Sequence, residues 1–132
     1  MKRRMLLSLF IPMILYSRCS LANKLVPIDN LYRLDILMSK IREFSGNLEA
    51  SIAVGERFLQ LYPEKKETTH LMYGVGCNPR QVHTYSRLKF LKRRYQDYLL
   101  GNTLIVDGWV LAQAELCVCA LVALYHSRLS CR

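Results

Sequence analysis

The stretch 103-TLIVDGWVLAQAELCVCALVALYHS-127 is the most apolar part of the chain downstream of its N-terminal segment, and it contains the only tryptophan. Residues 104–125 are long enough to cross a bilayer, but Asp107, Gln113 and Glu115 interrupt them, and an acidic side chain inside a membrane is costly. We therefore expect a helix that is buried on most sides, either within the domain or against a partner.

Trp109 and Tyr125 are the aromatic residues of this stretch to which we give a role. A large amphipathic aromatic side chain on an apolar helix either packs in the core or anchors a partner interface. We expect Trp109 to be a core residue. A partner interface is the alternative for Trp109. For Tyr125, the core and a partner interface both remain open.

Upstream, apolar residues recur at three- and four-residue spacings, and almost nothing alternates like a strand, so we expect more helices. The first spans about residues 29–44 and ends at Ser45-Gly46-Asn47. The second spans about residues 48–61 and stops before Pro63, because the residue before a proline is driven away from helical geometry. From residue 64 to residue 84 we expect irregular structure.

A further helix is expected over about residues 84–100, ended by Gly101-Asn102. Its apolar positions are expected to face inward: Tyr85, Leu88, Leu91, Tyr95 and Leu99. Its basic positions are expected to face solvent: Lys89, Lys92 and Arg93. The sequence therefore predicts an all-α fold, a small bundle of about four helices that occupies residues 23–132.

The N-terminal segment has the pattern of an export signal. Lys2, Arg3 and Arg4 precede an apolar run that ends near Tyr16, and small residues at positions 20 and 22 follow. This pattern predicts a signal peptide over residues 1–22, cleavage between Ala22 and Asn23, and a periplasmic protein. Arg3 and Arg4 also resemble a twin-arginine signal, and the choice between that route and general secretion stays open.

The formal net charge of +9 overstates the case for nucleic-acid binding. Without residues 1–22 the charge falls to +5, because four basic residues leave with the signal. The remaining basic cluster at 87–94 is explained by a solvated helix face, and no nucleic-acid-binding module accompanies it. We therefore expect no nucleic-acid partner.

Four cysteines would remain in the exported protein: Cys77, Cys117, Cys119 and Cys131. In an oxidising compartment we expect at least one disulfide, joining Cys77 or Cys131 to Cys117 or Cys119. Cys117 and Cys119 should not pair with each other, since residues two apart on a helix point in different directions. No second ligand pair is present to complete a tetrahedral metal site, so we expect no metal.

The titratable residues give no sign of a catalytic site. His70, His83 and His126 have no acidic partner at an evident spacing, and Gly74-Val75-Gly76 lacks the remaining features of a phosphate-binding loop. No nucleophile elbow or dinucleotide fingerprint is present. We therefore expect a protein that is not an enzyme.

Four segments together resemble a known family. They are 44-FSGNLE-49, 58-FLQLYP-63, 104-LIVDGWVLA-112 and 120-ALVALYHSRLSC-131. Their order is similar to that of the small subunit of the membrane-bound FAD-dependent sugar and polyol dehydrogenases. Phe44-Ser45-Gly46 stands where that family has Leu-Thr-Gly, Gly108 to Ala112 stand where a late helix carries Ala-Trp-Tyr-x-Gly, and Ala123-Leu124-Tyr125 echoes Ala-Leu-x-Tyr. Val110 departs from the pattern by replacing the tyrosine.

The resemblance implies a helical, non-catalytic accessory subunit that helps a large subunit to mature and to reach the periplasm. The large subunit would carry the FAD and the chemistry, in a complex that can include a cytochrome subunit and associate with the membrane. The alternative is a small exported helical protein, stapled by a disulfide or anchored through residues 104–125, with no dehydrogenase partner.

Overall fold

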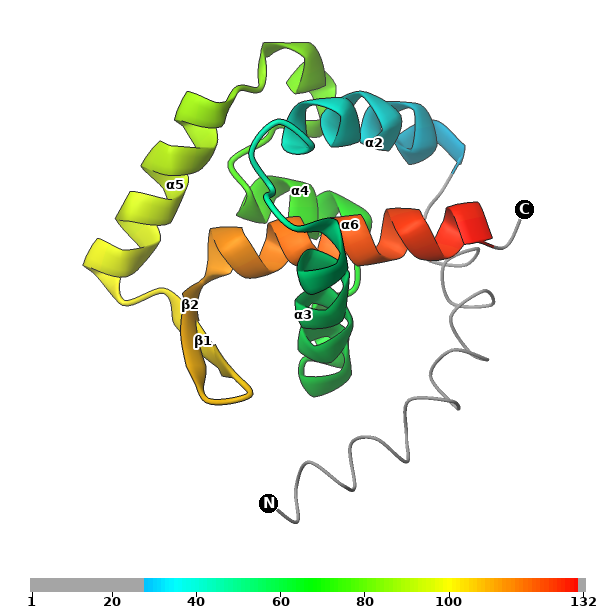
Figure 1. Ribbon diagram of the computed structural model, residues 1–132. Helices are drawn as coiled ribbons and strands as arrows, with labels where there is room; N and C mark the ends of the chain where they lie inside the picture. The colour runs from blue at the N-terminus through cyan, green and yellow to red at the C-terminus, as the bar shows by residue number, and fades with distance from the viewer. Residues whose placement is uncertain (1–27, 131–132) are drawn as a thin grey trace.

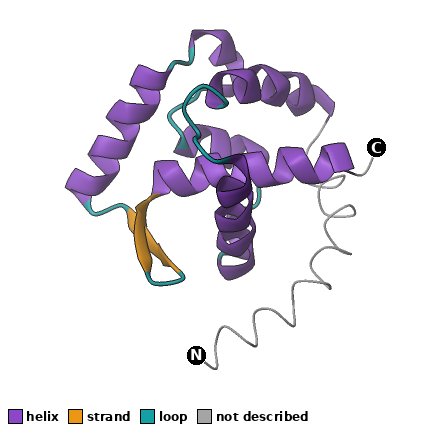
Figure 2. Ribbon diagram, viewed as in Figure 1, coloured by secondary structure: helices purple, strands orange, loops and turns teal. Residues whose placement is uncertain are grey.

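The computed structural model describes residues 28–130, and within them the fold is mainly helical, as the sequence predicts (Figures 1 and 2). The expected signal and cleavage residues Arg3, Arg4, Ala22 and Asn23, and the cysteine Cys131, lie outside the described residues. The elements in chain order are α2 (Ile28–Ile41), α3 (Leu48–Leu61), η1 (Pro63–Lys65), α4 (Thr68–Gly74), η2 (Pro79–Thr84), α5 (Arg87–Leu100), β1 (Thr103–Val106), β2 (Trp109–Ala112) and α6 (Gln113–Ser130).

Helix α6 is the centre of the fold, and α2, α3, α4 and α5 all contact it (Figure 1). Apolar residues occur on every side of α6, which is typical of a helix that is enclosed by others. Its buried residues include Leu116, Val118, Leu121 and Leu124. The expectation of a helix buried on most sides is therefore confirmed for the second half of the apolar stretch.

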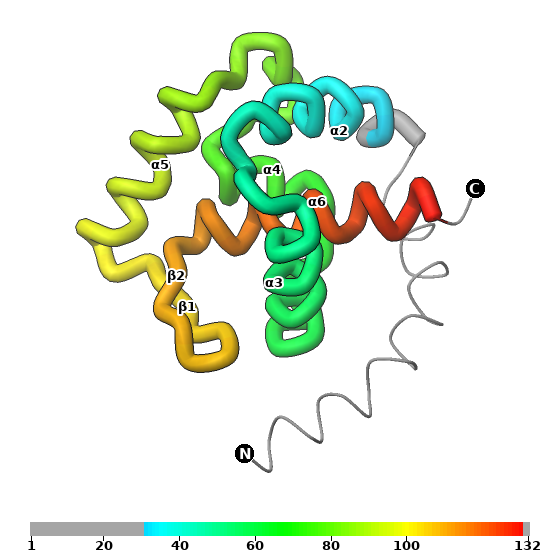
Figure 3. The backbone as a smooth tube through the Cα atoms, viewed as in Figure 1, coloured from blue at the N-terminus to red at the C-terminus, as the bar shows by residue number. Residues whose placement is uncertain are grey.

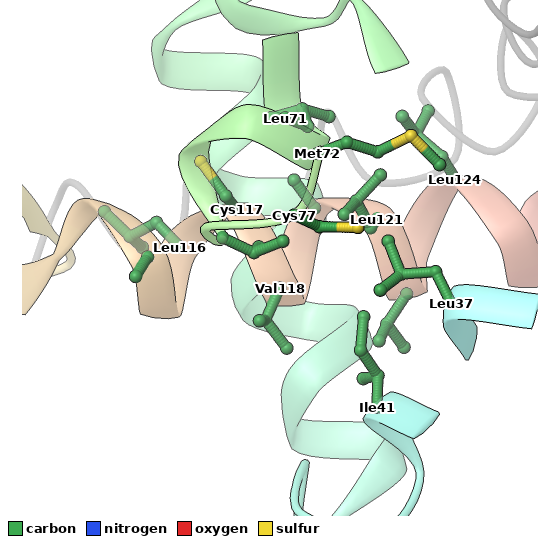
Figure 4. Packing of buried hydrophobic residues seen from close by; sticks show 14 of the residues in the cluster. Leu37, Ile41, Leu71, Met72, Cys77, Leu116, Cys117, Val118, Leu121 and Leu124 are labelled. Atoms are coloured by element: carbon green, nitrogen blue, oxygen red, sulfur yellow. The ribbon is translucent and has the colours of Figure 1, made fainter. Parts of the chain in front are cut away.

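The core forms where α2, α3 and α4 meet α6. Figure 4 shows Leu37 and Ile41 of α2 and Leu71 and Met72 of α4 converging on Leu121. All five of these side chains are fully buried. Since burying one such side chain stabilises a protein by roughly 1.5–3 kcal/mol, this cluster is the main source of stability.

Helix α3 crosses α6 in close backbone contact, and Gly55 makes that contact possible. A Cβ atom on Gly55 would collide with the backbone carbonyl of Cys119. Only glycine leaves room for two helix backbones at this separation. The bounds of α3 agree with the sequence prediction, and the Asn47 side chain caps the helix by accepting a hydrogen bond from the Ala50 amide at 3.1 Å.

The expectation of one helix across the whole apolar stretch is wrong for residues 103–112, which form a β-hairpin. β1 pairs with β2 in antiparallel register, with Ile105 opposite Val110 and Val106 opposite Trp109. The two turn residues, Asp107 and Gly108, have φ of 51° and 86°. Positive φ at both central positions is characteristic of the tight hairpin turn that Asp-Gly favours.

Residues 64–84 are more ordered than the sequence predicts, because they contain the short helix α4 between the turns η1 and η2. Leu71, Met72, Val75 and Val82 from this segment are buried in the core. Helix α2 ends at Ile41 and α5 begins at Arg87, each about three residues inside the expected bounds. No helix in the described part of the chain is long and apolar enough to cross a membrane.

Candidate functional site

Helix α5 lies along one edge of the molecule (Figure 3). Its basic residues Lys89, Lys92 and Arg93 are exposed as the sequence predicts, but three apolar positions that were expected to face inward are exposed too. Leu88, Tyr95 and Leu99 are 60%, 65% and 66% exposed. Tyr85, which precedes the helix, is buried as expected, and Leu91 is half-buried. The exposed stripe is therefore available to a partner.

The inward face of α5 is set by Phe90 and Asp97, which are both buried. The Phe90 ring stacks on Phe44 with centroids 4.9 Å apart. The Asp97 carboxylate accepts a hydrogen bond from the Ala114 amide at 2.8 Å, at the first turn of α6, and it lies 3.7 Å from Arg93. A carboxylate at a helix N-terminus satisfies a free amide and interacts favourably with the helix dipole. These contacts fix the orientation of α5.

Trp109 lies on β2 at the tip of the hairpin and is 73% exposed. The expectation that it is a core residue on a helix is therefore wrong, because the Asp-Gly turn removes it from the helix. Ile105 and Val110, which pair across the two strands, are also exposed. Tyr125 is half-buried on α6 and packs against the core.

The hairpin is held against α3 by polar contacts and by one apolar residue. The Arg57 guanidinium is 3.0 Å from the Asp107 carboxylate, and the Tyr62 hydroxyl donates a hydrogen bond of 3.4 Å to the Ile105 carbonyl. Val106 is buried in the core. The exposed apolar side chains at the tip are thus presented on a fixed support, which lowers the entropy cost of binding.

Exposed apolar side chains are concentrated in residues 88–110. Among the described residues, eight of the thirteen large apolar side chains that are exposed fall in this short segment: Leu88, Tyr95, Tyr98, Leu99, Leu100, Ile105, Trp109 and Val110. A concentration of this kind marks an interaction site more often than scattered single residues do. We divide it into the α5 stripe (Leu88, Tyr95 and Leu99) and the hairpin tip (Ile105, Trp109 and Val110).

An open pocket of about 320 Å³ lies beside α5, and its wall includes Phe44, Phe90 and Leu111. Its charged groups are Arg94 and Glu115, which are 3.7 Å apart. The Glu115 carboxylate also accepts hydrogen bonds from the Tyr98 hydroxyl at 2.6 Å and from the Ala112 amide at 3.0 Å.

The hydrogen bond to Glu115 raises the pKa of Tyr98 above its usual value, with smaller contributions from burial and from the charge of the carboxylate. The polar groups of this pocket are therefore engaged in joining α5, β2 and α6. These contacts hold the three elements together at the wall of the pocket.

The cysteines behave as packing residues in this structure. Cys77, Cys117 and Cys119 are free thiols, so the expected disulfide between Cys77 and one of the other two is not formed. Burial raises the pKa of Cys77 and Cys119 to about 11 and that of Cys117 to about 12. Protonated thiols are weak nucleophiles at neutral pH. The pairings that involve Cys131 stay predictions.

The histidines come from separate elements, with His70 on α4, His83 in η2 and His126 on α6. Within residues 28–130 no group of three or more His, Cys, Asp or Glu side chains is arranged to hold a metal ion.

Comparison with protein-family models, with curated proteins and with solved structures found no match.

The segments that carry the resemblance to the dehydrogenase small subunit lie in different parts of the fold. Phe44-Ser45-Gly46 lies in the turn after α2, and Ala123-Leu124-Tyr125 lies in α6. Gly108 to Ala112 lie in the hairpin turn and β2, whereas the resemblance implies a helix at this place.

Proposed function

We propose that this protein is a non-catalytic accessory subunit that binds a larger protein through the hairpin tip. The observation that carries the proposal is the 73% exposure of Trp109 on a hairpin tied to α3. Tryptophan is among the residues most often found at the centre of protein interfaces, because it supplies a large contact area with few rotatable bonds. Ile105 and Val110, which pair on the opposite face of the same two-stranded ribbon, are exposed as well and add a second apolar area to the tip.

The resemblance supplies the identity of the proposed partner: the large subunit of an exported FAD-dependent sugar or polyol dehydrogenase. In this proposal the FAD belongs to the partner, and the present chain assists its maturation and export to the periplasm. Two features support it. Trp109 belongs to the segment that resembles the family, and its side chain is accessible to a partner.

Co-purification of the tagged chain from its native host tests the proposal. We expect a large, flavin-containing protein to accompany the wild-type chain. Trp109→Ala should weaken that association by about 2–4 kcal/mol, or roughly 30- to 1,000-fold, while the melting temperature stays nearly unchanged because the side chain is exposed.

Tyr73→Ala is the matched control, since Tyr73 is an exposed aromatic residue on a different element, α4. This variant should retain the partner. A wild-type chain that purifies alone would contradict the accessory role, and so would undiminished association of Trp109→Ala. A partner without flavin would leave the binding role but remove the dehydrogenase assignment.

A further inference from the structure

The α5 stripe is a second surface, separate from the hairpin tip. Positions 88, 92, 95 and 99 follow one another at spacings of four, three and four residues, so they lie on one side of the helix. All four are exposed, and three of them are Leu88, Tyr95 and Leu99. A helix that buries Phe90 on one side and displays leucine and tyrosine on the other has an unpartnered apolar face.

The charged side chains around this apolar face of α5 are all basic. Arg87, Lys89 and Lys92 are exposed on α5 within six residues, whereas Arg93 lies toward the packed side, beside Asp97 and Gly76. The only acidic residue of the helix, Asp97, is 2% exposed and turned toward α6. The outward side of α5 therefore presents apolar side chains with basic flanks and no acidic side chain.

The position of the lysines favours a lipid surface over a protein surface. Lys92 lies within the apolar row itself, and Lys89 lies beside it, with its ammonium group donating an exposed hydrogen bond of 3.2 Å to the Thr84 hydroxyl. Charged residues are depleted from the centres of protein interfaces. At a bilayer surface, in contrast, the lysine stem lies along the apolar boundary while the ammonium group reaches the phosphates.

The exposed tyrosines of α5 also favour a lipid surface. Tyr95 and Tyr98 are 65% and 47% exposed on α5. Tyrosine is enriched at membrane–water boundaries, because its ring is apolar and its hydroxyl is polar. A helix of 14 residues, about 21 Å long, is too short to span a bilayer but can lie in its surface.

We infer that α5 docks on the surface of an anionic phospholipid bilayer, with Leu88, Tyr95 and Leu99 entering the boundary between headgroups and acyl chains and Lys89 and Lys92 contacting lipid phosphates. The basic helix and the negative surface are complementary in charge. The docking leaves the hairpin tip to a protein partner, so it goes beyond the proposed accessory role and does not depend on it.

Single-tryptophan probes test which part of the chain meets lipid. Because the chain has one tryptophan, Trp109→Phe removes its emission, and Tyr95→Trp in that background places a new probe in the α5 stripe. With vesicles of phosphatidylglycerol and brominated phosphatidylcholine, we expect this probe to lose about half of its emission or more, because it lies at acyl-chain depth.

Tyr73→Trp in the same background is the matched control on α4, and its emission should stay unchanged. The two proteins are to be prepared with the same N-terminus, so any vesicle attachment by the N-terminal segment is common to the two measurements. An unquenched probe at position 95, or equal quenching at positions 95 and 73, would overturn the inference.

Vesicle affinity then tests the chemistry of the contact. Replacing Lys89 and Lys92 with glutamine should lower affinity for phosphatidylglycerol vesicles by roughly thirtyfold and leave weak binding to neutral vesicles unchanged. Leu88→Gln with Leu99→Gln should also lower affinity by about tenfold. Circular dichroism should show the same fold for all variants, since the four residues are exposed.

Affinity that is insensitive to both pairs of substitutions would overturn the inference. The inference would equally fall if the α5 stripe bound an acidic protein while the wild-type chain ignored anionic vesicles. Trp109→Ala should leave vesicle affinity unchanged, and a loss equal to that of the α5 variants would contradict the separation of the two surfaces.

Discussion

Helices α5 and α6 both carry leucines at helical spacing, but the structure uses them in opposite ways. Leu121 on α6 is fully buried among side chains from α2 and α4 (Figure 4). Leu99 on α5, in contrast, is 66% exposed. The apolar residues of α6 are surrounded by other helices, and those of α5 have a protein neighbour on one side only. The same residue type therefore stabilises the fold in one helix and is available for binding in the other.

The largest expected effect comes from truncating the buried leucine. Leu121→Ala should lower the free energy of unfolding by about 2–5 kcal/mol, because it removes buried methyl groups and leaves a cavity in the core. Chemical denaturation followed by circular dichroism measures this difference. A loss below about 1 kcal/mol would mean that α6 is not the centre of the core.

A smaller effect is expected where α5 joins α6. Asp97→Ala should cost about 2–3 kcal/mol, because the buried Ala114 amide loses its acceptor and the α6 N-terminus loses a favourable charge. Asp107→Asn is the control, since it removes an exposed ion pair with Arg57 and keeps a residue suited to the turn. That control should cost less than about 1 kcal/mol. Equal losses in the two variants would contradict the anchoring role of Asp97.

The smallest effect is expected for the leucine on α5. Leu99→Ala should change the free energy of unfolding by less than about 0.5 kcal/mol, since the side chain is mostly exposed and alanine is a good helix former. The same denaturation experiment applies. A loss similar to that of Leu121→Ala would show that the α5 stripe is packed against protein and would remove the contrast between the two helices.

Local signals explain which parts of the fold could be predicted from sequence. The bounds predicted for α3 agree with the structure because Ser45-Gly46-Asn47 ends the preceding helix and Pro63 stops α3. Gly101, in left-handed geometry with φ of 71°, ends α5 where the sequence indicated. Each of these signals acts within a few residues, so no knowledge of the tertiary structure is needed to interpret it.

The hairpin was missed although its signal was present. Asp107-Gly108 lies between an apolar run of three residues and one of four, which is a strong hairpin pattern, but the overall length of the apolar stretch favoured a single helix. With the hairpin in place, Trp109 moves from the expected core to an exposed tip. The sequence therefore drew attention to Trp109, but it predicted the wrong element and a buried environment for this side chain.

The orientation of α5 could not be predicted from its own sequence. Apolar residues occur on both sides of the helix, with Leu88 and Leu99 on one side and Phe90 on the other. The inward side is chosen by Asp97, whose partner Ala114 lies 17 residues away in another helix. A buried acid that caps a distant helix is a tertiary interaction, and its local pattern looks like an ordinary polar position.

The fluorescence of Trp109 tests the central claim most directly, because the protein has no other tryptophan. We predict an emission maximum close to that of fully hydrated tryptophan and acrylamide quenching nearly as efficient as for a free tryptophan derivative, in the native protein at neutral pH. A blue-shifted emission that acrylamide reaches only after denaturation would place Trp109 in the core and contradict the exposed hairpin tip on which the binding role rests.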